Sequence, residues 1–327
     1  MKLASLKAGG RDGTLIVVDR SLSVYRAVPD IAPTLQRALE TWGETAPRLK
    51  AVYDELNRNT TMGEKVAMSA LASPLPRAYQ WLDGSAYLTH IERVRKARGA
   101  DMPPSFLTDP LMYQGGSDVF LGPWDTVTVR DEAWGIDFEA EVAVVTDDVP
   151  AGVGTEAAGQ HIKLIMLVND VSLRNLIPNE LAKGFGFLQG KPPTAFSPVA
   201  VTPDELGESW RENKVHLPLR IYLNEAFFGD PNAGQDMQFD FAALICHAAK
   251  TRPLSAGTIL GSGTVSNADL QRGFACLAEK RVVEIIGEGE AKTPFMRYGD
   301  RVRIEMLDAQ NHSIFGAIKQ TVQPCPP

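Results

Sequence analysis

WGIDFEAEVAVV, residues 134–145, alternates polar and apolar side chains and then becomes wholly apolar. This period of two predicts a β-strand with Asp137, Glu139 and Glu141 on one face. Carboxylates two positions apart on a strand face lie about 7 Å from each other, and each pair repels by roughly 2 kcal/mol at an effective dielectric near 20. The apolar run 142–145 is typical of a strand that enters a core. The segment therefore predicts a β-rich core beside a group that compensates the negative charge.

Two kinds of group can compensate three aligned carboxylates. A hard divalent cation such as Mg²⁺ or Ca²⁺ suits the oxygen ligands of this segment, because no His or Cys is interleaved with them. The alternative is a solvated acidic face with Lys or Arg across from it. The segment alone leaves both interpretations open.

Composition narrows the class of partner. The chain has 327 residues, 44% of them hydrophobic, and a formal net charge of -7. It can build a sizeable core, and no long basic run is present, so we expect a small-molecule partner and neither nucleic acid nor a membrane. No secretion signal or run of about 18 apolar residues is visible. The three cysteines show no paired spacing, and we expect a soluble cytoplasmic protein.

Periodicity predicts two domains. Residues 1–76 are expected to form a small amino-terminal α+β domain, with two short strands within 13–27 and a helical pattern from 32 to about 57. The stretch 69–78, rich in Pro and small residues, suggests the boundary, so that residues 77–327 form the larger domain. A helix is predicted over 85–97, beginning after Asp83 and Ser85 and containing His90.

Strand signals dominate the larger domain beyond residue 100. Many strands separated by Gly and Pro turns, with few βαβ units, predict an α+β, β-rich fold built as a mixed β-sandwich or roll. The predicted strands are 125–130, 134–145, 162–172, 199–201, 215–223, 259–264, 282–286 and 301–306.

Three residues outside the acidic strand suggest chemistry. Asp170 ends an apolar strand, where a carboxylate is costly unless it is paired or bound to metal. Arg174, four residues later, can hold a carboxylate in a bidentate fork. Lys191 lies in Gly-Lys-Pro-Pro, where a stiff loop can aim an ammonium group, although a solvated surface lysine is the commoner case. The sequence GSGT, 261–264, is interpreted as a strand-ending turn, although closely spaced glycines can also present amides to a carboxylate.

Together these blocks resemble the metal-binding core of the fumarylacetoacetate hydrolase family. The resemblance rests on DFEAEVAVV at 137–145, NDVSLR at 169–174, and Gly190-Lys191 followed by FSP at 196–198, and it covers residues 80–320. The amino-terminal part resembles the short leading domain of bacterial members. The resemblance implies the family's mixed β-sandwich roll, a homodimer, and a divalent cation, Mg²⁺ first, with Mn²⁺ or Ca²⁺ as alternatives. The implied metal ligands are Asp83, Glu139, Glu141 and Asp170.

The resemblance also implies catalytic residues. They are His90 as the base, Glu279 as the residue that orients it, and Lys191. The implied substrate contacts are Thr264 and Tyr113, with Lys191 and Arg174 as further candidates. Two positions depart from eukaryotic members, since Ser85 and Ile177 stand where those members have a substrate-contacting tyrosine and glutamine. Arg95 and Arg98 are both candidates to meet a distal carboxylate of the substrate.

The implied activity is metal-dependent hydrolysis of a carbon-carbon bond in a 1,3-diketo acid, with fumarylacetoacetate of tyrosine and phenylalanine catabolism as the expected substrate. His90 would take a proton from water, and Lys191 would stabilise oxyanion charge or deliver a proton. Alternatives on the same scaffold are acylpyruvate hydrolysis, oxaloacetate decarboxylation, and hydration or isomerisation of unsaturated diacids. A different class of protein, with a structural Ca²⁺ and no catalysis, predicts that His90 and Glu279 lie far apart.

Overall fold

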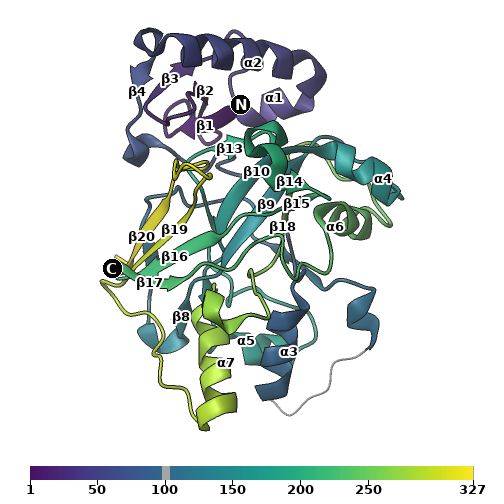
Figure 1. The fold of residues 1–327 in the computed structure, drawn as a ribbon, viewed down its shortest axis with the longest axis vertical. Helices are drawn as coiled ribbons and strands as arrows, with labels where there is room; N and C mark the ends of the chain where they lie inside the picture. The colour runs from purple at the N-terminus through teal and green to yellow at the C-terminus, as the bar shows by residue number, and fades with distance from the viewer. Residues whose placement is uncertain (98–103, 327) are drawn as a thin grey trace.

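The largest sheet has eleven strands and runs through both predicted domains. A computed structural model describes residues 1–97 and 104–326 of the chain. The hydrogen-bonded order is β4-β3-β2-β1-β13-β10-β9-β18-β5-β6, and β12 pairs with β10 outside this path. Antiparallel pairing of β1 with β13 joins the amino-terminal strands to the rest of the sheet (Figure 1). These strands are β1 (Lys2–Leu6), β2 (Thr14–Val18), β3 (Val24–Ala27), β4 (Glu64–Lys65), β5 (Trp81–Gly84), β6 (Met112–Gly115), β9 (Ala140–Thr146), β10 (Ile162–Asn169), β12 (Ala195–Phe196), β13 (Ala200–Val201) and β18 (Ile259–Gly261).

A second sheet of five strands has the order β17-β16-β19-β20-β7. Its strands are β7 (Val127–Val129), β16 (Leu219–Leu223), β17 (Ala226–Gly229), β19 (Arg301–Met306) and β20 (Ile318–Pro324). The described residues also form two short ribbons, one of β8 (Ile136–Asp137) with β11 (Ser172–Leu173) and one of β14 (Trp210–Arg211) with β15 (Lys214–Val215). The predicted α+β, β-rich fold is confirmed.

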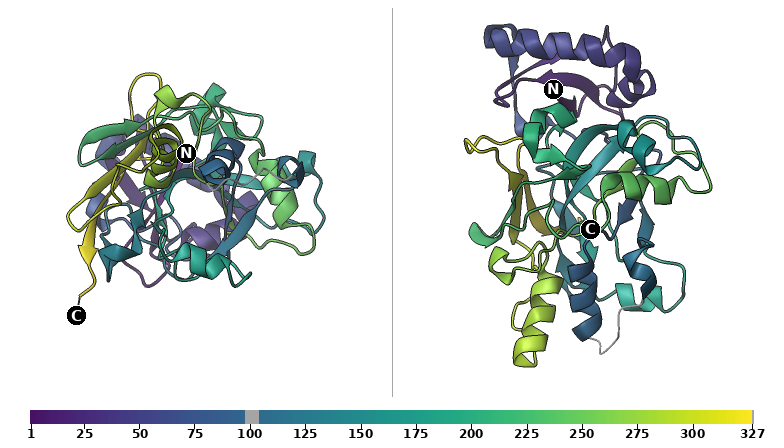
Figure 2. Two further views of the ribbon diagram at one scale, coloured as in Figure 1. Left: turned by 90° about the horizontal axis from the view of Figure 1, so that it is seen from below. Right: turned by 45° about the vertical axis from the view of Figure 1, so that its right-hand side comes forward.

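The helices gather at the two ends and one side of the molecule. The two amino-terminal helices, α1 and α2, cover the amino-terminal strands at one end, and α3 and α7 lie side by side at the other (Figures 1 and 2). None of the helices in the described ranges has the length and hydropathy to cross a lipid bilayer. The α-helices are α1 (Leu35–Glu40), α2 (Trp42–Arg58), α3 (Leu88–Ala97), α4 (Thr155–Ala158), α5 (Ile177–Leu181), α6 (Phe241–Ala248) and α7 (Leu277–Glu288). The 3₁₀ helices are η1 (Thr60–Met62), η2 (Met68–Ala70), η3 (Pro104–Leu107), η4 (Glu132–Trp134), η5 (Gly159–His161), η6 (Pro203–Ser209) and η7 (Leu270–Arg272).

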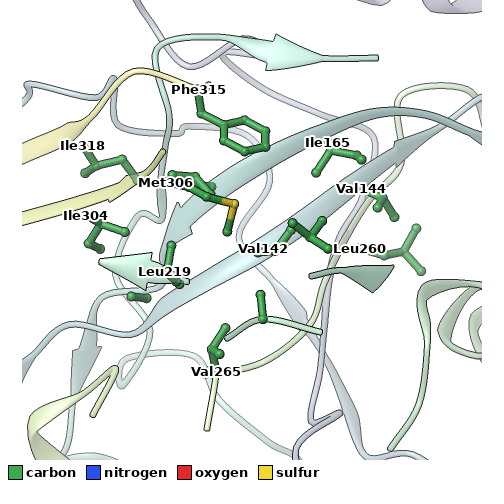
Figure 3. Packing of buried hydrophobic residues seen from close by; sticks show 14 of the residues in the cluster. Val142, Val144, Ile165, Leu219, Leu260, Val265, Ile304, Met306, Phe315 and Ile318 are labelled. Carbon is green, nitrogen blue, oxygen red and sulfur yellow. The ribbon is translucent and has the colours of Figure 1, made fainter. Parts of the chain in front are cut away.

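The apolar end of the opening segment, in β9, is buried on both faces. Val142 and Val144 point into the core between the two sheets, where they meet Ile165 and residues of the five-stranded sheet (Figure 3). Ala143 and Val145 point the other way, into the core that the sheet shares with α1 and α2. Alternate residues of one strand therefore serve two cores, which explains an uninterrupted apolar run.

The acidic segment is not one continuous strand. It forms β8 and β9 with a break at Phe138 and Glu139, because β8 pairs with β11 while β9 pairs with β10. The break moves the chain from a short ribbon into the main sheet. On either side of the break, Asp137 and Glu139 bind the same arginine, Arg174.

The prediction of a strand over 282–286 is wrong, because these residues lie in α7. The Cys276 side chain and the carboxylate of Asp137 accept hydrogen bonds from amides of the first turn of α7, and Gly289 ends the helix in a left-handed conformation with φ 87°. These end contacts decide in favour of a helix over the β-propensity of two Val and two Ile residues.

Candidate active site

Three carboxylates converge at the ends of neighbouring strands. Asp83 lies in β5, Glu141 in β9, and Asp170 directly follows β10. Because β9 pairs with β10 on one side and with β18 on the other, and β18 pairs with β5, the sheet brings these ends together. One oxygen from each carboxylate lies within 4.8 Å of the others, and all three residues are buried.

Gly261 of β18 makes room for this cluster. A Cβ at that position would lie 2.3 Å from Oδ1 of Asp83, a separation that real side chains do not adopt. Gly263, with φ 76°, donates its amide to the same Oδ1 over 3.0 Å. The stretch at 261–264 is therefore the predicted strand-ending turn, and it also presents an amide to a carboxylate.

Glu141 has the environment expected of a cation ligand. Both of its carboxylate oxygens are buried and without a hydrogen-bond partner among the residues that the structure describes. Burial, together with repulsion from Asp83 and Asp170, raises the pKa of the Glu141 carboxyl well above its ordinary value. The pKa of Asp83 is raised in the same way, by burial first and then by Asp170. A buried carboxylate of this kind needs a positive group beside it, and an all-oxygen set fits a hard divalent cation.

Glu139, the fourth predicted ligand, lies beside this cluster and binds two cationic side chains. Its Oε1 is 2.8 Å from the guanidinium of Arg174, and its Oε2 is 2.5 Å from Nζ of Lys191. Burial opposes ionisation, but Arg174 and Lys191 outweigh it and hold the pKa of Glu139 below its ordinary value. Arg174 also holds Asp137 at 2.8 Å, so its fork spans two carboxylates of the acidic segment. Basic side chains, one of the two groups that the sequence allowed for balancing the negative charge of the acidic segment, are therefore present.

Asp170 accepts more side-chain hydrogen bonds than the other three predicted ligands. Its Oδ2 accepts from Nζ of Lys191 at 2.5 Å and from the hydroxyl of Tyr113 at 2.6 Å, and its Oδ1 accepts from Thr194 at 2.7 Å. The predicted substrate contact Tyr113 is thus a hydrogen-bond donor to Asp170. The side chain of Lys191 is only 7% exposed, unlike that of the common surface lysine, because its ammonium joins Asp170 to Glu139.

His90 and Glu279 meet between α3 and α7. Nδ1 of His90 lies 3.0 Å from Oε2 of Glu279, and Oε1 of Glu279 accepts from Ser266 at 2.7 Å and also from Arg93. Burial opposes ionisation of Glu279, but the hydrogen bonds from His90, Ser266 and Arg93 prevail and hold its pKa below the ordinary value. The carboxylate therefore stays ionised while it orients the imidazole.

The position of Glu279 is fixed by the acidic segment. Oδ1 and Oδ2 of Asp137 accept the backbone amides of Leu277 and Ala278 at 2.8 and 2.9 Å. A carboxylate at a helix amino terminus satisfies free amides and interacts favourably with the helix dipole. Arg174 therefore links the start of α7, through Asp137, to Glu139 at the acid cluster.

A pocket of about 720 Å³ joins the acids to the histidine. Its described lining includes every predicted metal ligand except Asp170, together with His90, Lys191, Tyr113, Thr264 and Arg174. Glu279 lies behind His90. The side chain of Arg95 and all of Arg98 are outside the described residues, so the structure does not place either candidate for a distal carboxylate.

Sequence reasoning missed Arg93, Ser266 and Thr194. Arg93 is three residues after His90 on α3, a spacing that places both side chains on one face, and this signal was available. Ser266 and Thr194 follow the GSGT turn and Lys191 closely, but nothing local indicates that they reach Glu279 and Asp170.

Two family models match the chain. Residues 80–323 match the model described as "Fumarylacetoacetate (FAA) hydrolase C-terminal", and residues 1–77 match "Fumarylacetoacetase N-terminal domain 2".

Two curated proteins are similar in sequence. The chain is 27% identical over 159 residues to the mitochondrial oxaloacetate tautomerase fahd2 of Xenopus laevis, covering 48% of this chain and 47% of that protein. It is 26% identical over 241 residues to the oxaloacetate tautomerase YisK of Bacillus subtilis, covering 72% of this chain and 68% of that protein. The first match thus spans about half the length of the curated relative.

Solved structures share the fold over the whole chain. A fumarylacetoacetate hydrolase from Exiguobacterium antarcticum has a TM-score of 0.67 at 16% identity, covering 99% of this chain and 100% of its own. A maleylpyruvate hydrolase from Sphingobium sp. SYK-6, in complex with manganese(II) and pyruvate, has a TM-score of 0.64 at 15% identity and covers 100% of both chains.

Proposed function

The chain belongs to the fumarylacetoacetate hydrolase family, and on that premise we propose that it is a divalent-cation-dependent hydrolase that cleaves a carbon-carbon bond of a 1,3-diketo acid. The observation that carries the proposal is the hydrogen bond of 3.0 Å between His90 and Glu279, at a pocket that Asp83 and Glu141 of the acid cluster also line. The non-catalytic alternative predicted a wide separation of these two residues, and the observed geometry disagrees with it.

Asp83, Glu141 and Asp170 would hold the cation, Mg²⁺ first, with Mn²⁺ or Ca²⁺ as alternatives. Bound there, it would polarise a carbonyl of the substrate and stabilise negative charge on the leaving group. The unpartnered oxygens of Glu141 and the all-oxygen donor set support this assignment, as does the manganese of the similar maleylpyruvate hydrolase. Glu139 remains a proposed ligand, because a carboxylate oxygen that accepts one hydrogen bond keeps further acceptor capacity.

His90 is proposed to activate water. When Nδ1 donates to Glu279, Nε2 is left as the acceptor for a proton of water. The hydroxide equivalent adds to one carbonyl carbon of the substrate, and the bond from that carbon to the neighbouring CH₂ breaks. The CH₂ takes up a proton and becomes CH₃, so one water is consumed and two products leave, one of them a new carboxylic acid.

Lys191 is proposed to stabilise oxyanion charge and to supply the proton to the departing carbon. Its ammonium is buried and lies 2.5 Å from both Asp170 and Glu139. Burial alone would favour the neutral amine, but these two carboxylates raise the pKa of Lys191 above its ordinary value. The group therefore stays charged beside the acid cluster, where a fixed positive charge can stabilise an oxyanion.

Fumarylacetoacetate, which would place the enzyme in tyrosine and phenylalanine catabolism, is the reference substrate, and acylpyruvates form the neighbouring class. Tautomerisation of oxaloacetate is a second candidate, because both curated relatives carry that name and a single base at His90 could move a proton between carbon and oxygen without water. The two activities differ in whether water enters the product.

The test uses the purified chain, freed of metal and then supplied with Mg²⁺ or Mn²⁺, in water labelled with heavy oxygen. We expect cation-dependent loss of the enol absorbance of fumarylacetoacetate or acetylpyruvate, with one labelled oxygen in the new carboxylate. Fast enol-to-keto conversion of oxaloacetate without cleavage of any diketo acid would replace hydrolysis by tautomerisation. No cation-dependent reaction of any of these substrates would refute both.

We also propose a cytoplasmic homodimer. Light scattering should give twice the chain mass of 35.6 kDa, and a monomer would refute the dimer.

A further inference from the structure

We propose that Arg93 is a positioning residue of the active site, which supplies the permanent positive charge that Glu279 needs and thereby leaves His90 neutral. Since this role depends on His90 being the base, it rests on the proposed function. The contact between His90 and Glu279 does not by itself decide whether the imidazole carries a charge. The surroundings of the carboxylate decide it.

The guanidinium of Arg93 connects three segments of the chain. Arg93 lies on α3 and donates to Oε1 of Glu279 on α7. It also donates to Oγ of Ser266 at 3.2 Å and to the backbone oxygens of Asn267 and Ala268 at 2.8 and 3.2 Å. A planar fork with several donors suits such a set of fixed acceptors. The carboxylate of Glu279 is therefore held in one place relative to α3.

Glu279 needs a positive partner because it has little access to water. Its side chain is 1% exposed, against 16% for His90 and 15% for Arg93. A buried carboxylate is costly to ionise unless a positive group lies beside it. Within the described part of the chain, the ion pairs of Glu279 are those with His90 and Arg93. Because arginine does not lose its proton in proteins, Arg93 makes a charged imidazole unnecessary.

A neutral His90 is the form that the proposed reaction requires. His90 has to accept a proton from water, and an imidazolium has no free ring nitrogen for it. Without Arg93, the negative charge of Glu279 would stabilise the imidazolium, because an opposite charge in contact favours the charged form of a base. Arg93 thus keeps His90 available as a base near neutral pH.

The acidic groups that face His90 from other elements are balanced or neutral. Glu139 acts on His90 from the acidic segment, but Arg174 and Lys191 bind its two oxygens. The thiol of Cys276 lies within 4.8 Å of the imidazole, and burial raises its pKa well above the ordinary value, so the thiol stays neutral. The acid cluster would be balanced by its cation, so the measurements are made with Mg²⁺ bound.

The two other cations near the start of α7 are directed elsewhere. Nζ of Lys280 lies 5.5 Å from the ring centroid of Phe228, and the guanidinium carbon of Arg281 lies 4.2 Å from the ring centroid of Phe295. Neither residue therefore supplies the charge that Arg93 supplies.

Other hydrogen bonds connect the same segments, so variants of Arg93 are expected to fold. Oγ1 of Thr89 on α3 lies 3.1 Å from the backbone oxygen of Ser266 and 2.9 Å from its hydroxyl. Asn267 donates to two backbone oxygens in the segment 232–235. A melting curve for each variant checks this expectation.

The first experiment follows the protonation of His90 without turnover. NMR of the Mg²⁺-loaded protein with labelled histidine reports on each of its five imidazoles, and His90→Asn identifies the signal of His90. In Arg93→Met, the pH of half-protonation of His90 should rise by about one unit or more, because Glu279 loses its permanent cation. A residue that only placed Glu279 would give the opposite sign, since a displaced carboxylate stabilises the imidazolium less. An unchanged or lower pH of half-protonation in folded Arg93→Met would overturn the proposal.

Two further variants separate the charge of Arg93 from its shape and from charge elsewhere. Arg93→Lys keeps the positive charge but lacks the planar fork, so the pH of half-protonation should stay within about half a unit of the wild-type value. Lys280→Met removes a cation that is adjacent to Glu279 in the sequence but does not contact its carboxylate, and should behave like the wild type. A rise in Arg93→Lys as large as that in Arg93→Met would show that the charge is not what acts on His90.

Turnover separates this inference from the proposed function. On the acid side of the profile, the pH at which kcat/KM falls to half should rise by about one unit or more in Arg93→Met. A profile that keeps its wild-type position, with a rate lowered by the same factor at every pH, would refute the role of Arg93 and leave the proposed function intact. The NMR shift without cation-dependent turnover of any substrate would refute the proposed function alone.

Discussion

Nδ1 of His90 lies 3.0 Å from Oε2 of Glu279, although 189 residues separate the two in the chain. The contact exists because α3 and α7 pack side by side and because Asp137 fixes the first turn of α7. Arg174 extends this connection to Glu139, so the acid cluster and the proposed base are held by one set of hydrogen bonds.

His90→Asn is expected to lower kcat by about 10²–10⁴ because it removes the proposed general base. The Kd for Mg²⁺ should stay near that of the wild type, since His90 is not part of the acid cluster. Steady-state rates and calorimetric titration with Mg²⁺ measure the two quantities. His161→Asn is the matched control, because His161 also pairs with an acid, Asp147 at 2.7 Å, outside the pocket. A similar loss of kcat in both variants would contradict the role of His90.

Glu141→Gln is expected to change stability in opposite directions with and without cation. In the metal-free protein it replaces a buried carboxylate that has no partner among the described side chains, which should stabilise the fold by about 1–3 kcal/mol. In the wild type, Mg²⁺ at about 100 times its Kd should add ~2.7 kcal/mol, and the variant should lose this gain.

Urea unfolding with Mg²⁺ or with a chelator measures both effects. Glu290→Gln, at an exposed position on the surface, serves as the control and should behave like the wild type. If Mg²⁺ stabilises Glu141→Gln as strongly as the wild type, Glu141 is not a ligand.

The fold could be predicted where the local pattern and the tertiary environment agree. The apolar runs of β9 and β10 indicated buried strands, and both faces of these strands are buried. Residues 282–286 misled because their β-branched side chains favour a strand. The spacing of Ala278, Arg281, Val282 and Ile285, at helical intervals on one face, was the signal that indicated a helix. Pairing of β1 with β13 joins segments about 200 residues apart, and no local pattern reports it.

The candidate site divides in a similar way. Asp83, Glu141 and Asp170 were expected from the family resemblance, and the structure brings them within 4.8 Å. That Glu139 would bind Arg174 and Lys191 at once was not predictable, because the register of separate segments decides which cation reaches which carboxylate. The hydrogen bonds from the amides of Leu277 and Ala278 to Asp137 were not predictable either, because they also join segments that are far apart in the sequence.

Lys191→Met is expected to separate cation binding from turnover. Nζ of Lys191 lies 2.5 Å from Oδ2 of Asp170, so its positive charge competes with a cation for the same acid. Removing it should lower the Kd for Mg²⁺ by up to about tenfold while kcat falls at least about 10²-fold, the loss typical of an electrostatic catalytic group. Lys163→Met, which breaks an ion pair with Asp147, should leave both quantities near the wild-type values. Weaker Mg²⁺ binding in Lys191→Met would contradict the competition.

Glu180→Gln is expected to loosen the loop that carries Lys191. The Glu180 carboxylate accepts the backbone amides of Leu188, Gln189 and Gly190, the three residues before Lys191, at distances from 2.7 to 3.2 Å. Glutamine offers one acceptor oxygen in place of two, so the variant should lose about 1–2 kcal/mol at pH 7. If Glu180 positions Lys191, kcat should fall, and the Kd for Mg²⁺ should fall by less than in Lys191→Met.

The pH dependence of the unfolding free energy tests whether the three amides stabilise the ionised carboxylate of Glu180. Burial opposes ionisation of Glu180, but the three amides prevail and hold its pKa below the ordinary value of 4.5. A lowered carboxyl pKa contributes stability above the unfolded-state value, and this contribution disappears as the pH falls through the folded-state value. The difference in unfolding free energy between the wild type and Glu180→Gln should thus be constant above about pH 5 and shrink below 4.5. Urea unfolding at several pH values measures it, with the exposed Glu156→Gln as control, and a difference that persists unchanged into acid would show that the amides do not act on the ionised carboxylate.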